Sequence, residues 1–256
     1  MATNLILDYT SYGASKYAVE KWHYSQRMPS SKLVRIGVWE DDKFIGVVLF
    51  GCGASPPLYK RLNRLFGLKP TECCELVRVA LTKHQSSVSR IVSIAIKLLR
   101  KRCPGLKLIV SFADNDQGHH GGIYQAGNWL YCGLRNVGHR DGYLINGRQV
   151  HCRSMPALGL RNTLDDARKV DPNAQPVVGS GKHQYFYVLG DEELRRKVEA
   201  MKQPYPCATK IDAPTIADSC VTSIENDATA IHAVEGENST VTLQYDRPQG
   251  SPTKVS

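Results

Sequence analysis

The chain has 256 residues, with 33 lysines and arginines against 24 aspartates and glutamates, a net charge of +9 at neutral pH. Apolar residues make up 42% and charged residues 22%, as in ordinary globular proteins. No apolar run approaches the roughly 20 residues of a membrane-spanning helix, which excludes a membrane protein. The first residues lack the basic and apolar blocks of a secretory signal, so we expect none.

The charge is unevenly distributed. From Cys207 onward three basic residues stand against seven acidic ones, so residues 1–206 carry a net +13. A region this basic favours a polyanionic partner, with nucleic acid first, and a basic protein without such a partner is the alternative. The polar, acidic composition of 207–256 predicts a disordered C-terminal tail, and 1–206 is the predicted folded domain.

The cysteine pattern indicates the compartment. Eight cysteines are scattered along the chain, and no two have the CxxC spacing of zinc sites. Scattered thiols are typical of a reducing environment, where cysteine packs as a small apolar residue. We therefore expect a cytoplasmic protein.

The first elements are a strand, a helix and a hairpin. An apolar stretch at 4–8 is followed by a helical segment that ends at 27–29. Two strand-like runs, 33–39 and 44–50, flank a polar turn and predict a hairpin.

A basic amphipathic helix is predicted next. The apolar residues of 58–66 share one helical face, at Leu58, Leu62 and Leu65. The opposite face is basic and is a candidate for contacts with a DNA backbone, with a solvated surface as the alternative. Its residues are Lys60, Arg61 and Arg64.

The remaining elements continue this alternation. They are a strand at 74–81, a helix at 88–102, a buried strand at 106–113, a helix at 122–130, strands at 143–153 and 183–189, and a charged helix at 192–201. This order predicts an α/β domain around a mixed central sheet flanked by helices.

The start of the helix at 88 is a candidate phosphate site. A helix N-terminus offers unpaired backbone N–H groups and the positive end of the helix dipole. The glycine-rich fingerprints of nucleotide-binding loops are absent, and a well-capped helix is the structural alternative. The candidate residues are Ser86, Ser87, Ser89 and Arg90.

Asp114 ends the buried strand and precedes a glycine-rich turn at 118–122. Open α/β sheets bind ligands at this edge. A carboxylate there serves as a base, as a metal ligand or as a loop cap, and the sequence leaves these roles open. His119 and His120 have the look of a metal pair, but adjacent histidines on a loop are usually solvated.

The predicted helix at 122–130 carries amide and aromatic groups. On a helix, Tyr124, Asn128 and Tyr131 would share one face. Such groups suit a flipped adenine, which needs hydrogen bonds at its edge and stacking on its face. If the substrate is adenine, Asn128 and Trp129 are the residues expected to wall its pocket. The alternative is that Trp129 and Tyr131 are core aromatics.

Three sequence blocks resemble the Mom family of phage DNA adenine-modification proteins: ELVR at 75–78, IVSFAD at 109–114 and IYQAGNW at 123–129. The similarity extends over roughly 1–206 and includes WHY at 22–24 and VHCR at 150–153. It implies a GNAT-like acyltransferase fold, whose sheet splays after its central strand to admit an acyl donor. It also implies conversion of adenine to N6-(carbamoylmethyl)adenine, which protects phage DNA from restriction in the host cytoplasm.

The resemblance further implies roles for single residues. Arg78 and Ser89 correspond to donor-side positions. The family has been linked with iron, for which the ligands would be His23, Tyr24 and Asp114. A buried, hydrogen-bonded histidine is the alternative for His23. The catalytic positions implied are His23, Tyr24, Asp114 and Tyr124.

The donor is less clearly indicated. GNAT enzymes bind the pyrophosphate of coenzyme A with a glycine-containing loop, whereas 84–90 has no glycine, which argues against acetyl-CoA. A carbamoylmethyl group is an isomer of a glycyl group. We therefore also expect a glycyl donor such as glycyl-tRNA.

Three functions stay open. The favoured one is a DNA adenine-modifying enzyme with double-stranded DNA as its partner, tRNA as a second partner, and a homodimer as its assembly. The others are a GNAT N-acyltransferase that acts on a small amine or a protein, and a DNA-binding protein without catalysis. Salt-dependent DNA binding separates the second from the other two.

Overall fold

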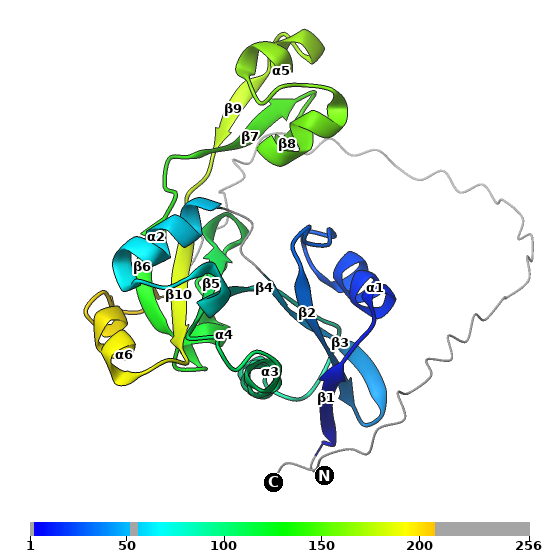
Figure 1. Ribbon diagram of the computed structural model, residues 1–256. Coiled ribbons are helices and arrows are strands. Elements are labelled where there is room, and N and C mark those ends of the chain that lie inside the picture. The colour runs from blue at the N-terminus through cyan, green and yellow to red at the C-terminus, as the bar shows by residue number, and fades with distance from the viewer. Residues whose placement is uncertain (1–2, 52–55, 208–256) are drawn as a thin grey trace, which may run out of the picture. The chain divides into compact units, whose positions relative to one another are not determined.

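The computed structural model of the protein describes residues 3–51 and 56–207. Apart from Cys207, the predicted tail lies outside these residues. The described part of the chain contains a mixed seven-stranded sheet with the order β1-β2-β3-β4-β5-β10-β6 (Figure 1). Its strands are β1 (Leu5–Tyr9), β2 (Leu33–Glu40), β3 (Lys43–Gly51), β4 (Cys73–Leu81), β5 (Leu108–Asp114), β6 (Leu130–Arg135) and β10 (Lys182–Val188).

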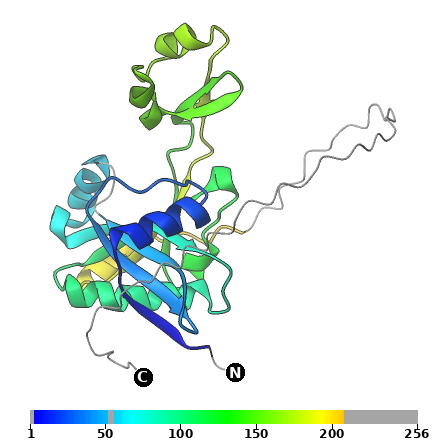
Figure 2. The ribbon, with the colours of Figure 1, turned by 90° about the vertical axis from the view of Figure 1, so that its right-hand side faces the viewer.

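Helices cover both faces of this sheet. Side chains alternate along β5, so Ile109 packs with α3 on one face, whereas Leu108 and Val110 pack with α2 and α6 on the other. Figure 2 shows α1 lying across the sheet, where it packs on the same face as α2. The helices are α1 (Tyr12–Trp22), α2 (Pro56–Phe66), α3 (Val88–Arg102), α4 (Gly122–Gln125) and α6 (Glu192–Glu199).

The central strands β4 and β5 form a fork. They are parallel and pair only from Cys73–Leu108 to Glu75–Val110, although both strands continue beyond these residues. The mixed sheet, its flanking helices and this divergence are those expected for a GNAT-like acyltransferase fold. The fork leaves the C-terminal ends of both strands open to side chains from elsewhere in the chain.

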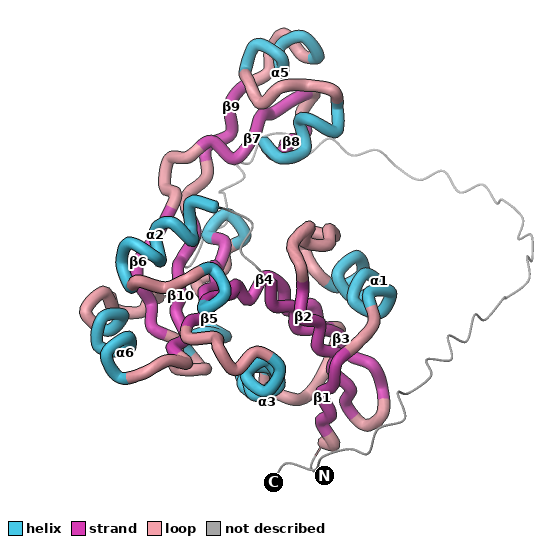
Figure 3. Tube along the Cα trace, in the orientation of Figure 1, coloured by secondary structure: helices cyan, strands magenta, loops and turns pink. Residues whose placement is uncertain are grey.

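An insertion at 136–181, between β6 and β10, builds a second sheet with the order β8-β7-β9. Figure 3 shows the loops that lead into and out of it. Its strands are β7 (Arg140–Ile145), β8 (Arg148–His151) and β9 (Gln175–Val178). The helix α5 (Leu164–Val170) lies between β8 and β9 in the chain. Tyr143, Met155 and Ala167 belong to a core of its own.

The hairpin β2–β3 and the helix α3 confirm the sequence predictions closely. Three other predictions are wrong in part. The first helix ends at Trp22 and not at 27–29. Leu65 of α2 is 37% exposed, because Phe66 takes the buried position. The predicted strand at 143–153 is a hairpin, since Asn146 and Gly147 turn the chain with positive φ.

The predicted helix at 122–130 is confirmed only over its first four residues. α4 ends at Gln125, and Asn128 has a φ of 58°, a left-handed conformation that stops a helix. Tyr131 then lies in β6, so Tyr124, Asn128 and Tyr131 do not share a helical face.

None of the helices in the described part of the chain has the length and apolar character of a membrane span.

Candidate active site

Asp114 forms an ion pair at the open end of the fork. Lys182 lies directly opposite it on β10, and its Nζ is 2.8 Å from Asp114 Oδ2. The carboxylate also accepts a hydrogen bond from the Asp116 N–H group, so it caps the following turn as well. Burial lowers the pKa of Lys182, but the pairing with Asp114 outweighs it and the pKa is raised. Lys182 therefore keeps its positive charge at neutral pH.

His23 lies at the C-terminal end of α1 and is held by its own turn. The Ser25 N–H group donates to His23 Nδ1. A nitrogen that accepts from a backbone amide carries no proton, so the neutral ring bears its proton on Nε2. Burial, helped by the charges of Arg78 and His119, lowers the pKa of His23 to about 4. His23 is thus a neutral hydrogen-bond donor.

Tyr24 connects the end of α1 to the ion pair. Its ring stacks on His23, with centroids 4.3 Å apart, and meets His119 edge-on. Burial and the charge of Asp114 raise the pKa of the phenol, against the opposite effect of Arg78 and Lys182. Tyr24 therefore keeps its proton at neutral pH, and the residue is 54% exposed.

Arg78 brings a guanidinium group from β4 into the same site. Its Nη1 donates to the Val77 carbonyl, while its buried Nε has no hydrogen-bond partner. Burial lowers its pKa, whereas the nearby Tyr24 and Glu75 raise it. An arginine with a buried donor still unpaired is suited to an acceptor on a ligand.

The insertion contributes to this site. Arg27, which follows α1, donates from Nη1 to Ser154 Oγ at 2.6 Å. Arg153 lies close enough to Arg78 to lower its pKa. Burial and the charge of Arg153 lower the pKa of His151. The VHCR block at 150–153 therefore lies beside the residues from α1 and β4.

Tyr124 lies on the α3 side of the fork. Its hydroxyl is 2.8 Å from Ser111 Oγ, which donates to the Leu76 carbonyl at 2.9 Å. Burial raises the pKa of Tyr124 to about 12, and its ring contacts Trp129. The phenol is thus protonated over the physiological range.

Glu40 occupies part of the predicted phosphate site. Its carboxylate accepts hydrogen bonds from the backbone N–H groups of Gln85 and Ser86, both at 2.8 Å. The Ser87 side chain makes no capping bond to α3. Free donors are therefore expected at the first turn of the helix, at Val88, Ser89 and Arg90, rather than in the loop before it.

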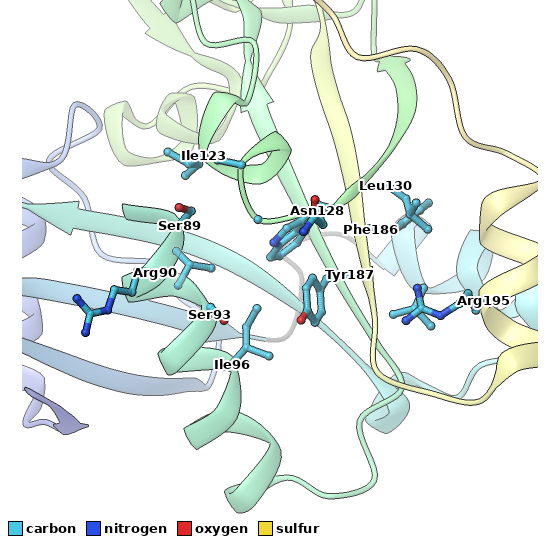
Figure 4. A pocket seen from close by; sticks show the side chains of 15 residues that line it. Ser89, Arg90, Ser93, Ile96, Ile123, Asn128, Leu130, Phe186, Tyr187 and Arg195 are labelled. Carbon is cyan, nitrogen blue, oxygen red and sulfur yellow. The ribbon is translucent and has the colours of Figure 1, made fainter. Parts of the chain in front are cut away.

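A hollow of about 440 Å³ runs along α3 toward α4 and β10. Ser89 and Ser93 line it from α3, with Asn128 and Tyr187 opposite them (Figure 4). The hollow is thus lined both by residues predicted to bind the donor, Ser89 and Arg90, and by a residue predicted to contact adenine, Asn128. Trp129 also lines it, but its side chain is 1% exposed and packs on Tyr124 and Tyr187, which fits the core-aromatic alternative.

The predicted site residues therefore fall into three groups. His23, Tyr24, Arg78 and Asp114 gather at the fork, with Tyr124 behind them. Ser89, Arg90, Asn128 and Trp129 line the hollow beside α3. Lys60, Arg61 and Arg64 lie on α2 and line a second hollow of about 370 Å³.

The sequence model of the Mom protein family matches residues 4–207. The chain belongs to the Mom protein family. The methylcarbamoylase Mom of Escherichia phage Mu is 28% identical over 202 residues, which are 73% of this chain and 78% of that protein. The resemblance read from the sequence is confirmed, and with it the assignment as a transferase.

Two solved acetyltransferases are similar at lower levels. One is a Bacillus subtilis acetyltransferase in complex with CoA, with a TM-score of 0.40 and 13% identity, covering 74% of this chain and all of that one. The other is an agmatine N-acetyltransferase, with a TM-score of 0.37 and 10% identity, covering 73% of this chain and all of that one.

The iron ligands implied by the Mom family do not fit this arrangement. Within residues 3–51 and 56–207, no three His, Cys, Asp or Glu side chains are grouped to hold a metal. Lys182 neutralises Asp114, and His23 Nε2 carries the proton that a metal would have to displace. The cationic Arg78 lies beside both His23 and Tyr24.

Three residues of the site were not predicted from the amino-acid sequence. Lys182 and Glu40 act on partners 68 and 46 residues away in the chain, so no local pattern reveals them. Ser111 does leave a signal, because it is a polar residue inside the apolar strand β5. Its hydroxyl is fully buried and bridges Tyr124 and Leu76.

Proposed function

We propose that the protein converts adenine in phage DNA to N6-(carbamoylmethyl)adenine and so protects that DNA from host restriction. Membership of the Mom family supports this proposal, and the phage Mu relative is a methylcarbamoylase by name. The net charge of +13 on residues 1–206 suits a DNA substrate. A GNAT enzyme for a small amine would have no need of that charge.

The observation that carries the proposal is the gathering of Asp114, Lys182, Tyr24, His23 and Arg78 at the fork. Transfer to N6 requires a proton to leave the amine and another to reach the leaving group. The Asp114 carboxylate is the acceptor, and the protonated Tyr124 is the donor. His23 Nε2–H and Arg78 supply hydrogen bonds to the oxygen of the transferred group.

Adenine reaches these groups only after it leaves the base stack. The exposed ring of Tyr24 is the surface on which a flipped base stacks beside Asp114. Asn128 and Trp129 line the hollow that begins at Ser89, so we assign them to the donor end of the site. This replaces the role in an adenine wall that the sequence suggested for them.

The donor binds from the α3 side. The first-turn N–H groups of α3, with Ser89 and Arg90, are suited to a phosphate. These N–H groups are suited to the phosphates of an acyl-CoA. The N–H groups of Gln85 and Ser86 are not free for that purpose, because they donate to the Glu40 carboxylate. A glycyl ester such as glycyl-tRNA also satisfies the chemistry. N6 forms an amide bond to the glycyl carbonyl as the ester C–O bond breaks, and the tRNA leaves as its hydroxyl after taking up a proton. The rearrangement to carbamoylmethyl breaks the N6–C(O) and CH2–NH2 bonds and forms the N6–CH2 and C(O)–NH2 bonds, without gain or loss of atoms.

Mass spectrometry of nucleosides tests the function. Plasmid DNA from cells that express the chain should contain a deoxyadenosine heavier by one carbamoylmethyl group. Asp114→Ala should abolish it, whereas Asp8→Ala, which removes an exposed carboxylate on β1, should not. Unmodified adenine beside soluble wild-type protein would overturn the proposal. Full activity of purified protein without any glycine-derived donor would exclude the glycyl route alone.

A further inference from the structure

Three arginines gather where α2 crosses the end of β6. Arg61 and Arg64 lie on α2, and Arg135 is the last residue of β6. Burial lowers the pKa of Arg61, and the charges of Arg135 and Arg64 lower it further. Within the described ranges none of the three forms an ion pair with a carboxylate. The cluster therefore concentrates positive charge without a counter-charge from these residues.

Arg135 is held in place by neutral groups. Its Nη2 donates to the Cys132 carbonyl at 2.8 Å, and its Nε donates to Gln184 Oε1 at 3.3 Å. Gln184 is fully buried, and its Nε2 has no hydrogen-bond partner. A buried amide donor without an acceptor, beside guanidinium groups that form no ion pair with a carboxylate of the described residues, is suited to an anion.

The cluster is joined to Asp114 through the sheet. Lys182 lies directly opposite Asp114 on β5 and directly opposite Arg135 on β6. Residues opposite each other in a sheet point to the same face, and neighbouring strands are about 4.8 Å apart. Arg135 thus lies roughly 10 Å from Asp114 on the face that α2 covers.

This separation matches a nucleic-acid strand. A DNA strand rises 3.4 Å per phosphate along its axis, so a phosphate roughly 10 Å from the target base lies within about three nucleotides of it. A donor phosphate at the start of α3 lies on the opposite face, as the alternation of Ile109 with Leu108 and Val110 shows. The two phosphate sites therefore lie on opposite faces of the sheet, which suits two different molecules.

We propose that Arg61, Arg64 and Arg135 bind backbone phosphates of the DNA strand that carries the target adenine, within about three nucleotides of that base. Gln184 is a positioning residue that orients Arg135. These phosphate contacts do not recognise the base sequence, and they direct the DNA strand toward Asp114. This inference rests on the proposed function, since it takes the adenine to react at the fork.

Salt-dependent binding of duplex DNA tests the cluster. Each phosphate contact contributes about −0.9 to the slope of log K against log[salt]. Arg61→Gln and Arg135→Gln should each reduce the steepness of that slope by about 0.9 on any sequence. Arg100→Gln, an exposed residue on α3, is the matched control and should leave the slope unchanged. Unchanged slopes in both cluster variants would overturn the inference.

Neutral methylphosphonates locate the contact. Replacing single phosphates within about three nucleotides of the target adenine should weaken binding by the wild type. The same replacement should cost Arg135→Gln no further affinity. An equal loss in both proteins would show that Arg135 does not touch that phosphate. Gln184→Glu, which sets a carboxylate against Arg135, should reduce the slope without lowering the melting temperature, and an unchanged slope would remove Gln184 from the site.

The outcomes separate this inference from the proposed function. If the wild type modifies adenine and the cluster variants bind DNA as tightly as the wild type, the proposed function holds and the inference about the cluster is overturned. Reduced binding of tRNA with unchanged binding of DNA would assign the cluster to RNA and overturn the inference. DNA binding that responds to the cluster, without any adenine modification, would overturn the proposed function alone.

Discussion

The histidine at the end of α1 is a fixed donor because of one residue in its own turn. Ser25 provides both a backbone N–H group and a hydroxyl to His23 Nδ1. The ring is therefore not a proton acceptor in the folded protein at neutral pH. Its low pKa has a consequence for stability.

We expect His23 to make the protein acid-sensitive. Its pKa is about 4 when folded against 6.5 for the free side chain, so the unfolded chain binds more protons between these values. Stability is full above pH 6.5 and is lost as the pH falls through 4. In His23→Asn the amide oxygen still accepts from Ser25, but nothing titrates.

Urea denaturation at pH 7.5 and pH 5 measures this effect. The drop in unfolding free energy between the two should be smaller in His23→Asn than in the wild type. Equal drops in both proteins would show that His23 is not desolvated.

Tyr124 is the second residue whose proton matters. Tyr124→Phe keeps the ring against Trp129 and removes only the hydroxyl. We expect DNA modification to fall by about 10² to 10⁴-fold, the usual contribution of an acid catalyst. Stability should fall by only about 1 kcal/mol, because Ser111 still has the Leu76 carbonyl. Ser111→Ala is the control: modification should fall less, and an equal fall would make Ser111 the essential group.

Among the elements, α2 shows which face of a basic helix is buried. Leu62 is 1% exposed, whereas Leu65 is 37% exposed. We expect Leu62→Ala to cost about 2–5 kcal/mol of unfolding free energy. Leu65→Ser should change it by less than about 0.5 kcal/mol. Urea titrations that show equal losses would mean that Leu65 is buried, as its position in the sequence suggests.

The predicted burial of Leu65 on α2 failed for a physical reason. Leu58, Leu62 and Leu65 fit one helical stripe, but Leu62 and Phe66 fit another just as well. Periodicity restricts the buried side of a helix to a range of directions and does not select single residues within it. The ring of Phe66 packs against Phe186 of β10, and Leu65 is left at the surface. Only the packing partner decided between them.

At the scale of the whole molecule, the insertion is the part most separate from the sheet. It has its own core. It begins after Arg135 and ends before Lys182, and these two residues pair directly across β6 and β10. An Asn-Gly turn between these two residues would close a β6–β10 hairpin.

We expect the protein without residues 136–181 to fold with one cooperative transition but to modify DNA about 10²-fold more slowly. It keeps the seven-stranded sheet and loses the Arg153 and Ser154 contacts near Arg78 and Arg27. Circular dichroism melting and nucleoside mass spectrometry measure the two effects. Full modification by the shortened chain would show that the insertion plays no part in the reaction.

The sequence by itself determined the elements with strong local patterns and the family. Alternation and 3.6-residue periodicity depend on near neighbours, so β2, β3 and α3 were predictable, as was the position of Asp114 at the end of β5. The tertiary structure alone decided what Asp114 touches and how the loop before α3 is held. Lys182 and Glu40 reach their partners only because the sheet brings distant strands together, and contacts across such separations leave no periodic trace in a sequence.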